Sequence, residues 1–125
     1  WEPGAPSFQD RLSSLKTAHL RDFQTSISGE PMLDGDPDAL IAADRPYVTD
    51  SIWLGKINRL RHILPLTCPR DSKAIRRGEA LGALQSDKAI RSLYARYCRD
   101  PMIKWKDSIK VVVGLNRPTV AGLDE

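Results

Sequence analysis

The sequence is poor in cysteine, histidine and aromatic residues. Two cysteines and two histidines occur in 125 residues, and aromatic side chains make up 6% of the chain. So few cysteines exclude the disulfide framework of a small secreted scaffold and favour a reducing compartment. His19, His62, Cys68 and Cys98 match no zinc spacing. We therefore expect no metal site and an intracellular location, cytoplasmic or nuclear.

Long apolar runs are missing as well. No uninterrupted apolar stretch approaches the roughly twenty residues needed to cross a bilayer. The first fifteen residues are polar and contain two prolines, which is unlike a signal peptide. The sequence predicts no membrane span, and attraction of basic side chains to anionic lipid headgroups stays a weaker alternative.

Catalytic signatures are also lacking. A serine or cysteine nucleophile needs a positioned base, and neither histidine lies in a recognisable motif. No glycine-rich phosphate loop is present. Asp34, Asp36 and Asp38 alternate as in a calcium loop. Ala39 and Arg45, however, occupy the positions that need glycine and a bidentate glutamate. We expect a protein that is not an enzyme and takes no cofactor.

Charge is segregated along the chain. Residues 1–50 hold nine acidic and four basic side chains, whereas residues 51–110 hold five acidic and fourteen basic ones. A segment this basic raises the local concentration of polyanions, of which nucleic acid is the commonest. The charge pattern therefore predicts a nucleic-acid partner, RNA or DNA.

Helical periodicity dominates the rest of the chain. Apolar residues recur at three-to-four-residue intervals between capping signals. We expect helices over residues 7–26, 36–43, 50–64, 71–84, 86–98 and 101–113, the last with a strand as its alternative. The predicted fold is all-α: a compact bundle of five or six helices, with a short irregular or strand-like C-terminal segment as a variant. Residues 1–125 form a single helical domain in which 1–6 and 115–125 are extended and 27–50 is loop-rich.

The predicted interface lies on the basic helices. Arg76 and Arg77 form its expected centre, because they are adjacent cations on a strongly amphipathic segment. The predicted nucleic-acid-binding residues are Lys56, Arg59, Arg70, Lys73, Arg76, Arg77, Lys88, Arg91, Arg96, Arg99, Lys104, Lys106 and Lys110.

Three features bear on how such an interface would work. Residues 72–98 have the size of a helix-turn-helix, although Gly78 falls inside the first helix, and plain helix packing gives the same pattern. Tyr94 and Tyr97 fit a core stripe better than a base-stacking platform. Trp105, flanked by Lys104 and Lys106, is the better candidate for an exposed aromatic side chain.

An alternative function belongs to another class. The same basic face could be solvated and partly neutralised by the acidic N-terminal half, or it could dock an acidic protein. The chain would then be a protein-interaction or assembly module, such as a domain of a viral or multisubunit complex, and could form oligomers. Nucleic-acid binding is the leading hypothesis, and this module is its rival.

Overall fold

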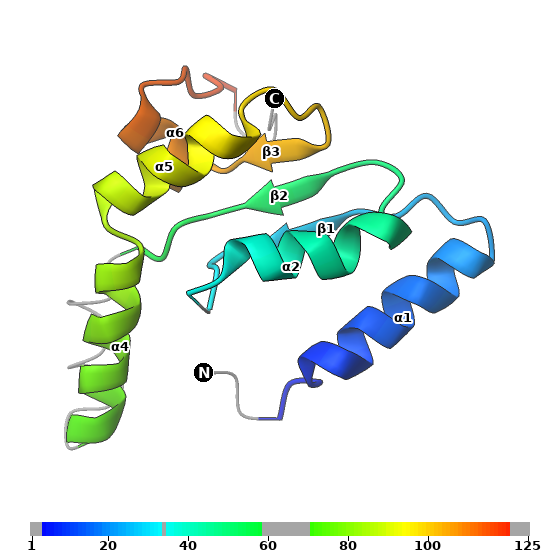
Figure 1. The fold of residues 1–125 in the computed structure, drawn as a ribbon, viewed down its shortest axis with the longest axis horizontal. Helices are drawn as coiled ribbons and strands as arrows, with labels where there is room; N and C mark the ends of the chain where they lie inside the picture. The colour runs from blue at the N-terminus through cyan, green and yellow to red at the C-terminus, as the bar shows by residue number, and fades with distance from the viewer. Residues whose placement is uncertain (1–3, 34, 59–70, 121–125) are drawn as a thin grey trace.

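The chain folds into an α/β structure in which helices pack against a small parallel sheet (Figure 1). The computed structural model describes residues 4–33, 35–58 and 71–120. In chain order the elements are α1 (Phe8–Leu20), β1 (Ile27–Gly29), α2 (Pro37–Asp44), the 3-10 helix η1 (Arg45–Tyr47), β2 (Ile52–Leu54), α4 (Ser72–Leu84), α5 (Asp87–Tyr97), β3 (Ile103–Trp105) and α6 (Asp107–Val113). The predicted all-α bundle is therefore wrong.

The sheet is three-stranded and parallel, with β2 in the centre. Ile52 is in register with Ile27 on β1 and with Ile103 on β3. Partners in a parallel register share a face, so these three isoleucines form one apolar row. A second row, Gly29, Leu54 and Trp105, lies on that same face, because side chains alternate with a period of two.

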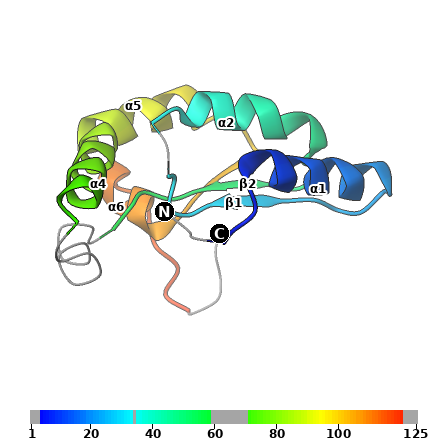
Figure 2. The same ribbon diagram turned by 90° about the horizontal axis from the view of Figure 1, so that it is seen from below.

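The connecting helices cover the apolar face. Figure 2 shows α2 and α5 together on one side of the sheet. Connections between parallel strands are usually right-handed. When successive connections lead to the next strand in the same direction across the sheet, their helices lie on the same face. The opposite face carries the row Ser28, Trp53 and Lys104, in which Ser28 and Lys104 are exposed.

The buried core lies between the sheet and the helices that cover it. It consists of Met32, Ile41, Val48, Ile52, Leu54, Ile90, Leu93, Ile103, Trp105 and Ile109. Ile52, Leu54 and Ile109 are fully enclosed. The central strand and the helices over it therefore hold the fold together.

Helix starts follow the predicted capping signals. Ser7 and Asp10 form a reciprocal capping box at α1. Asp36 accepts a hydrogen bond from the Ala39 amide at the start of α2, and Asp71 and Ser86 cap α4 and α5 in the same way. These starts are confirmed, although α1 ends at Leu20 rather than near Ser26.

Two helix predictions are wrong where strands form. The segment Ile52–Leu54 is β2 instead of the first turn of a helix over 50–64, and residues 59–70 of that prediction lie outside the described part. Likewise, Ile103–Trp105 is β3, and a helix begins only at Asp107. That helix ends as predicted at Gly114, whose φ of 78° is the left-handed conformation glycine adopts readily.

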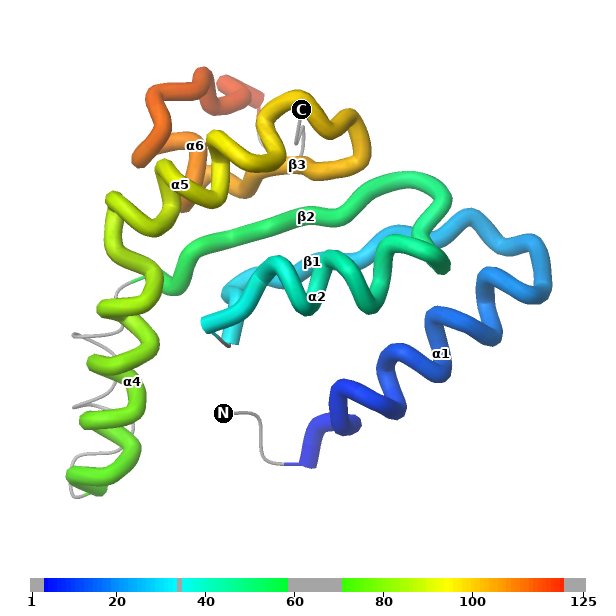
Figure 3. The backbone as a smooth tube through the Cα atoms, in the orientation of Figure 1, coloured from blue at the N-terminus to red at the C-terminus, as the bar shows by residue number. Residues whose placement is uncertain are grey.

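The chain path explains how distant segments meet. Figure 3 shows the backbone leaving β2 toward α4 and returning through α5, so that β3 lies beside β2. The segment 27–50, predicted to be loop-rich, contains β1, α2 and η1. Within the described residues, no helix combines the length and the apolar character needed to traverse a bilayer.

Candidate nucleic-acid interface

The first group of predicted cations lies on α4. Lys73, Arg76 and Arg77 are exposed, and their spacing of three and four residues places them on one side of the helix. Gly78 and Leu81 are buried on another side. In Figure 1, α4 extends away from the sheet and its covering helices. This geometry presents the three cations to solvent.

A second group follows on α5 and just after it. Lys88, Arg91 and Arg99 are exposed, whereas Ile90 and Leu93 face the core. None of these three cations forms an ion pair with a residue that the structure describes, and the same is true of Lys73 and Arg76. Five exposed cations, two on α4, two on α5 and Arg99 just after α5, are thus available to an anionic partner.

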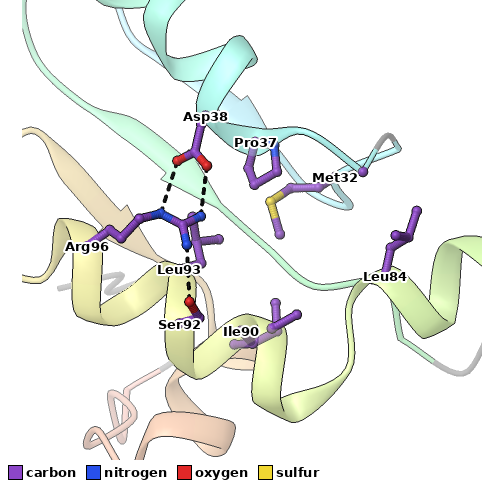
Figure 4. Close-up of a pocket in the computed structure, with 10 residues that line it drawn as sticks. Met32, Pro37, Asp38, Leu84, Ile90, Ser92, Leu93 and Arg96 are labelled. Carbon is purple, nitrogen blue, oxygen red and sulfur yellow. Dashed lines mark hydrogen bonds and ion pairs between the residues drawn. The ribbon is translucent and has the colours of Figure 1, made fainter.

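Three other predicted cations are engaged by acidic side chains. Lys56 Nζ lies 2.6 Å from Asp87 Oδ1, and this contact is the main reason that the pKa of Asp87 is lowered. Arg96 binds Asp38 at 2.9 Å, as Figure 4 shows together with its contact to Ser92. Lys106 Nζ lies 3.7 Å from Glu30. Asp38 and Glu30 of the acidic N-terminal part therefore neutralise Arg96 and Lys106, and Asp87 neutralises Lys56 within the basic segment itself.

The remaining positions are scattered. Lys104 lies on the open face of the sheet, on the other side from α5. Lys110 is only 4% exposed and cannot reach a partner without rearrangement. Arg59 and Arg70 lie outside the described residues. The five available exposed cations therefore come from the consecutive helices α4 and α5 and the turn after α5, whereas Lys104 and Lys110 lie elsewhere.

Aromatic side chains occupy different places from those expected. Trp105 is 8% exposed and belongs to the core, where the Tyr94 ring meets it edge-on with centroids 5.3 Å apart. Trp53, half-buried on the face of the sheet opposite α2 and α5, instead contacts a cation of this segment, with Lys106 Nζ 4.7 Å from its ring centroid. Its alternation with Ile52 and Leu54 could have identified it, had those residues been read as a strand.

The carboxyl edge of the sheet is the usual ligand site of open α/β folds. Here Glu30 and Lys106, which follow β1 and β3, contact each other, and the Lys56 amide donates to Ser108 Oγ at 2.9 Å. A Cβ added to Gly55 would lie 2.8 Å from the Glu30 side chain, so the edge is closely packed. The groups at this edge satisfy one another.

The acidic loop before α2 has structural roles. Asp36 caps the helix, and Asp38 accepts hydrogen bonds from Arg96 and from the Tyr97 hydroxyl. The described residues contain no cluster of three histidine, cysteine or carboxylate side chains able to hold a metal ion. Asp34 lies outside the described part.

Comparison with known proteins adds no assignment. No family model, curated protein or solved structure matches this chain. The function is therefore argued from the chain's own residues, and the exposed cations of α4 and α5 are the feature with the clearest chemical meaning.

Proposed function

We propose that this protein binds nucleic acid through the phosphate backbone, without catalysis, using the cations of α4 and α5. The single observation that carries the proposal is that Lys73, Arg76, Lys88, Arg91 and Arg99 are exposed and form no ion pair with described residues. Lysine and arginine at a surface are the groups that contact phosphates in nucleic-acid complexes.

The arrangement favours backbone contacts over base recognition. Lys73 and Arg76 lie on the first half of α4, and about 12 Å of helix separates Arg76 from the end of α4 at Leu84, at a rise of 1.5 Å per residue. The α5 cations follow after the end of α4. Cations spread along two consecutive helices match a line of phosphates, and such contacts carry little sequence information.

The test measures affinity and its salt dependence together. Labelled single-stranded RNA, single-stranded DNA and duplex DNA of several lengths are titrated with the full chain at several salt concentrations. In the double variant Lys73→Ala, Arg76→Ala, affinity should fall at least tenfold at low salt. The slope of log affinity against log salt should become shallower by about 2 if each cation releases one counterion.

A matched control removes the same charge elsewhere. Arg21 and Arg117 are exposed and lie outside α4 and α5. The variant Arg21→Ala, Arg117→Ala should lose much less affinity than the α4 variant and keep the slope. Equal effects of the two double variants would show only a net-charge effect and would refute the α4 surface.

The rival function makes a different prediction for the same titration. If α4 and α5 dock an acidic protein, affinity for nucleic acid should be weak at physiological salt and should not grow with oligonucleotide length. That outcome would overturn the proposal.

A further inference from the structure

A separate cavity lies between α1 and the segment that runs from β1 into α2. Its volume is about 380 Å³, within the usual range of small-molecule sites. Its apolar walls include Phe8, Leu12, Leu15, Ile27, Met32 and Leu40. None of these residues belongs to the proposed nucleic-acid interface. The cavity is therefore suited to an apolar molecular body, independently of the proposed function.

Two acidic side chains line this cavity, the exposed Glu30 and the buried Asp44. Asp44, the last residue of α2, is 5% exposed. It forms no hydrogen bond or ion pair with any residue that the structure describes. Buried carboxylates are normally paired, because leaving one without a partner is costly. Consistent with this isolation, burial raises the pKa of the Asp44 carboxyl.

The other polar groups of the cavity do not satisfy Asp44. Arg11 Nε donates to the Pro6 carbonyl at 3.0 Å, and Glu30 lies near Lys106. Both side chains are exposed, and neither pairs with Asp44. Asp44 therefore presents to the cavity a carboxylate that has no hydrogen-bond donor among the described residues.

The free edge of β1 adds backbone groups to the same cavity. Ile27 donates to the Ser51 carbonyl, and the Gly29 carbonyl accepts from Gly55, so these residues face β2. Because hydrogen-bonding directions alternate along a strand, the amide and carbonyl of Ser28 point to the unpaired edge. Ser28 also lines the cavity. These groups can hold a polar part of a ligand beside the apolar walls.

We propose that this cavity binds a primary ammonium group carried on an apolar stem, with the ammonium donating to Asp44. An ammonium supplies three donors and the charge opposite to a carboxylate, and charge-assisted hydrogen bonds of this kind are the strong ones. A neutral apolar ligand would fill the walls but leave Asp44 without a donor. A free alkylamine and the side chain of a lysine in a peptide share the required chemistry.

The test compares two probes of nearly equal shape. Hexylammonium and 1-hexanol are titrated into the ¹⁵N-labelled full chain, and amide shifts are followed by NMR. Hexylammonium should bind at least tenfold more tightly, with shifts centred on Leu12, Ser28 and Asp44. Equal affinities, or shifts centred elsewhere, would overturn the proposal.

Two variants separate recognition from folding. Asp44→Asn keeps the shape of the side chain and should lower hexylammonium affinity at least tenfold while leaving 1-hexanol affinity unchanged. Leu33→Trp, at a half-buried position lining the cavity, should abolish binding of both probes. An unperturbed spectrum away from the cavity verifies that each variant is folded. A folded Asp44→Asn variant that binds hexylammonium normally would refute the role of Asp44.

A third arm distinguishes the two sources of the ammonium group. A blocked Val-Lys-Val tripeptide can pair with the β1 edge while its lysine reaches Asp44. Tighter binding of this peptide than of hexylammonium identifies a peptide lysine as the ligand, and weaker binding identifies a free amine. In either case, the Asp44→Asn variant should bind the tighter of these two probes more weakly than the parent chain does.

Discussion

The Arg96 guanidinium holds the Asp38 carboxylate through two hydrogen bonds, Nε to Oδ1 at 3.3 Å and Nη2 to Oδ2 at 2.9 Å (Figure 4). The same carboxylate accepts from the Tyr97 hydroxyl at 2.6 Å, which is the main reason that the pKa of Tyr97 is raised. Asp38 begins α2 and both partners lie on α5, so this cluster joins the two helices that cover the sheet.

Asp38→Asn should have opposite effects on stability and on nucleic-acid binding. Both partners of the ion pair are nearly half exposed, so the loss of stability should be about 0.5 to 1 kcal/mol, measured by urea unfolding. Removing this acid also leaves Arg96 unneutralised beside the α5 cations, so affinity for nucleic acid should rise two- to fivefold.

Asp22→Asn is the matched control for this prediction. Asp22 is exposed and has a φ of 57°, a conformation that asparagine tolerates. This variant changes the net charge equally, far from α5 in sequence. If it raises affinity as much as Asp38→Asn does, the gain reflects net charge alone.

Gln85 should be more important for stability than a polar side chain usually is. It is 4% exposed, donates to the Met32 carbonyl at 2.6 Å and accepts from the Ile57 amide at 2.7 Å. Gln85→Leu leaves both backbone groups without a partner and should cost about 2 to 4 kcal/mol. Hydrogen exchange of the Ile57 amide should accelerate, whereas the exposed Gln24→Leu should change stability by less than about 0.5 kcal/mol. An unchanged exchange rate would contradict the bridging role.

The ion pair between Arg45 and Asp100 predicts loss of stability in acid. The hydrogen bond from Arg45 is the main cause of the lowered pKa of Asp100. The unfolded state therefore takes up a proton near pH 4 while the folded state still resists protonation, and stability falls as the pH decreases further. Arg45→Ala should be less stable than the parent chain at pH 7, by the small amount typical of an exposed ion pair. The two stabilities should converge as the pH falls through the lowered pKa of Asp100, because the carboxyl is then protonated in both states; a constant gap would contradict this origin.

Asp44 predicts the opposite dependence on pH. Its pKa is raised by burial, so the folded state binds more protons than the unfolded state above about pH 4, and stability falls as the pH rises through that range. Asn does not titrate. Asp44→Asn should therefore gain stability relative to the parent chain between pH 4 and pH 7, by about 1 kcal/mol or more. Urea unfolding at both pH values measures this gain, and a relative loss at pH 7 would contradict it.

Local signals in the sequence predicted several helix starts. Ser7, Asp36 and Ser86 each cap a helix at the expected position, because capping depends on the next three residues only. The strands escaped prediction because each has three residues, too few for alternation to stand out from helical spacing. Their pairing partners also lie far away along the chain, where no local pattern points to them.

For the candidate sites, too, features set by local sequence could be predicted and features set by tertiary contacts could not. The cations of α4 and α5 could be assigned to exposed positions from helical periodicity. The pairing of Arg96 with Asp38 and the burial of Lys110 depend on tertiary contacts, so composition alone overestimated the basic surface. Asp44 was not singled out from the sequence, because its burial depends on tertiary packing, in which α1 lies beside α2.

The strand order β1-β2-β3 has a consequence for how the molecule folds. About fifty residues separate Ile52 from its register partner Ile103, so joining β3 to β2 requires closure of a long loop and carries a large entropic cost. The helices α4 and α5 lie within that loop and need only local contacts to form. The sheet should accordingly assemble late, and the rate of folding should be governed by this single distant encounter.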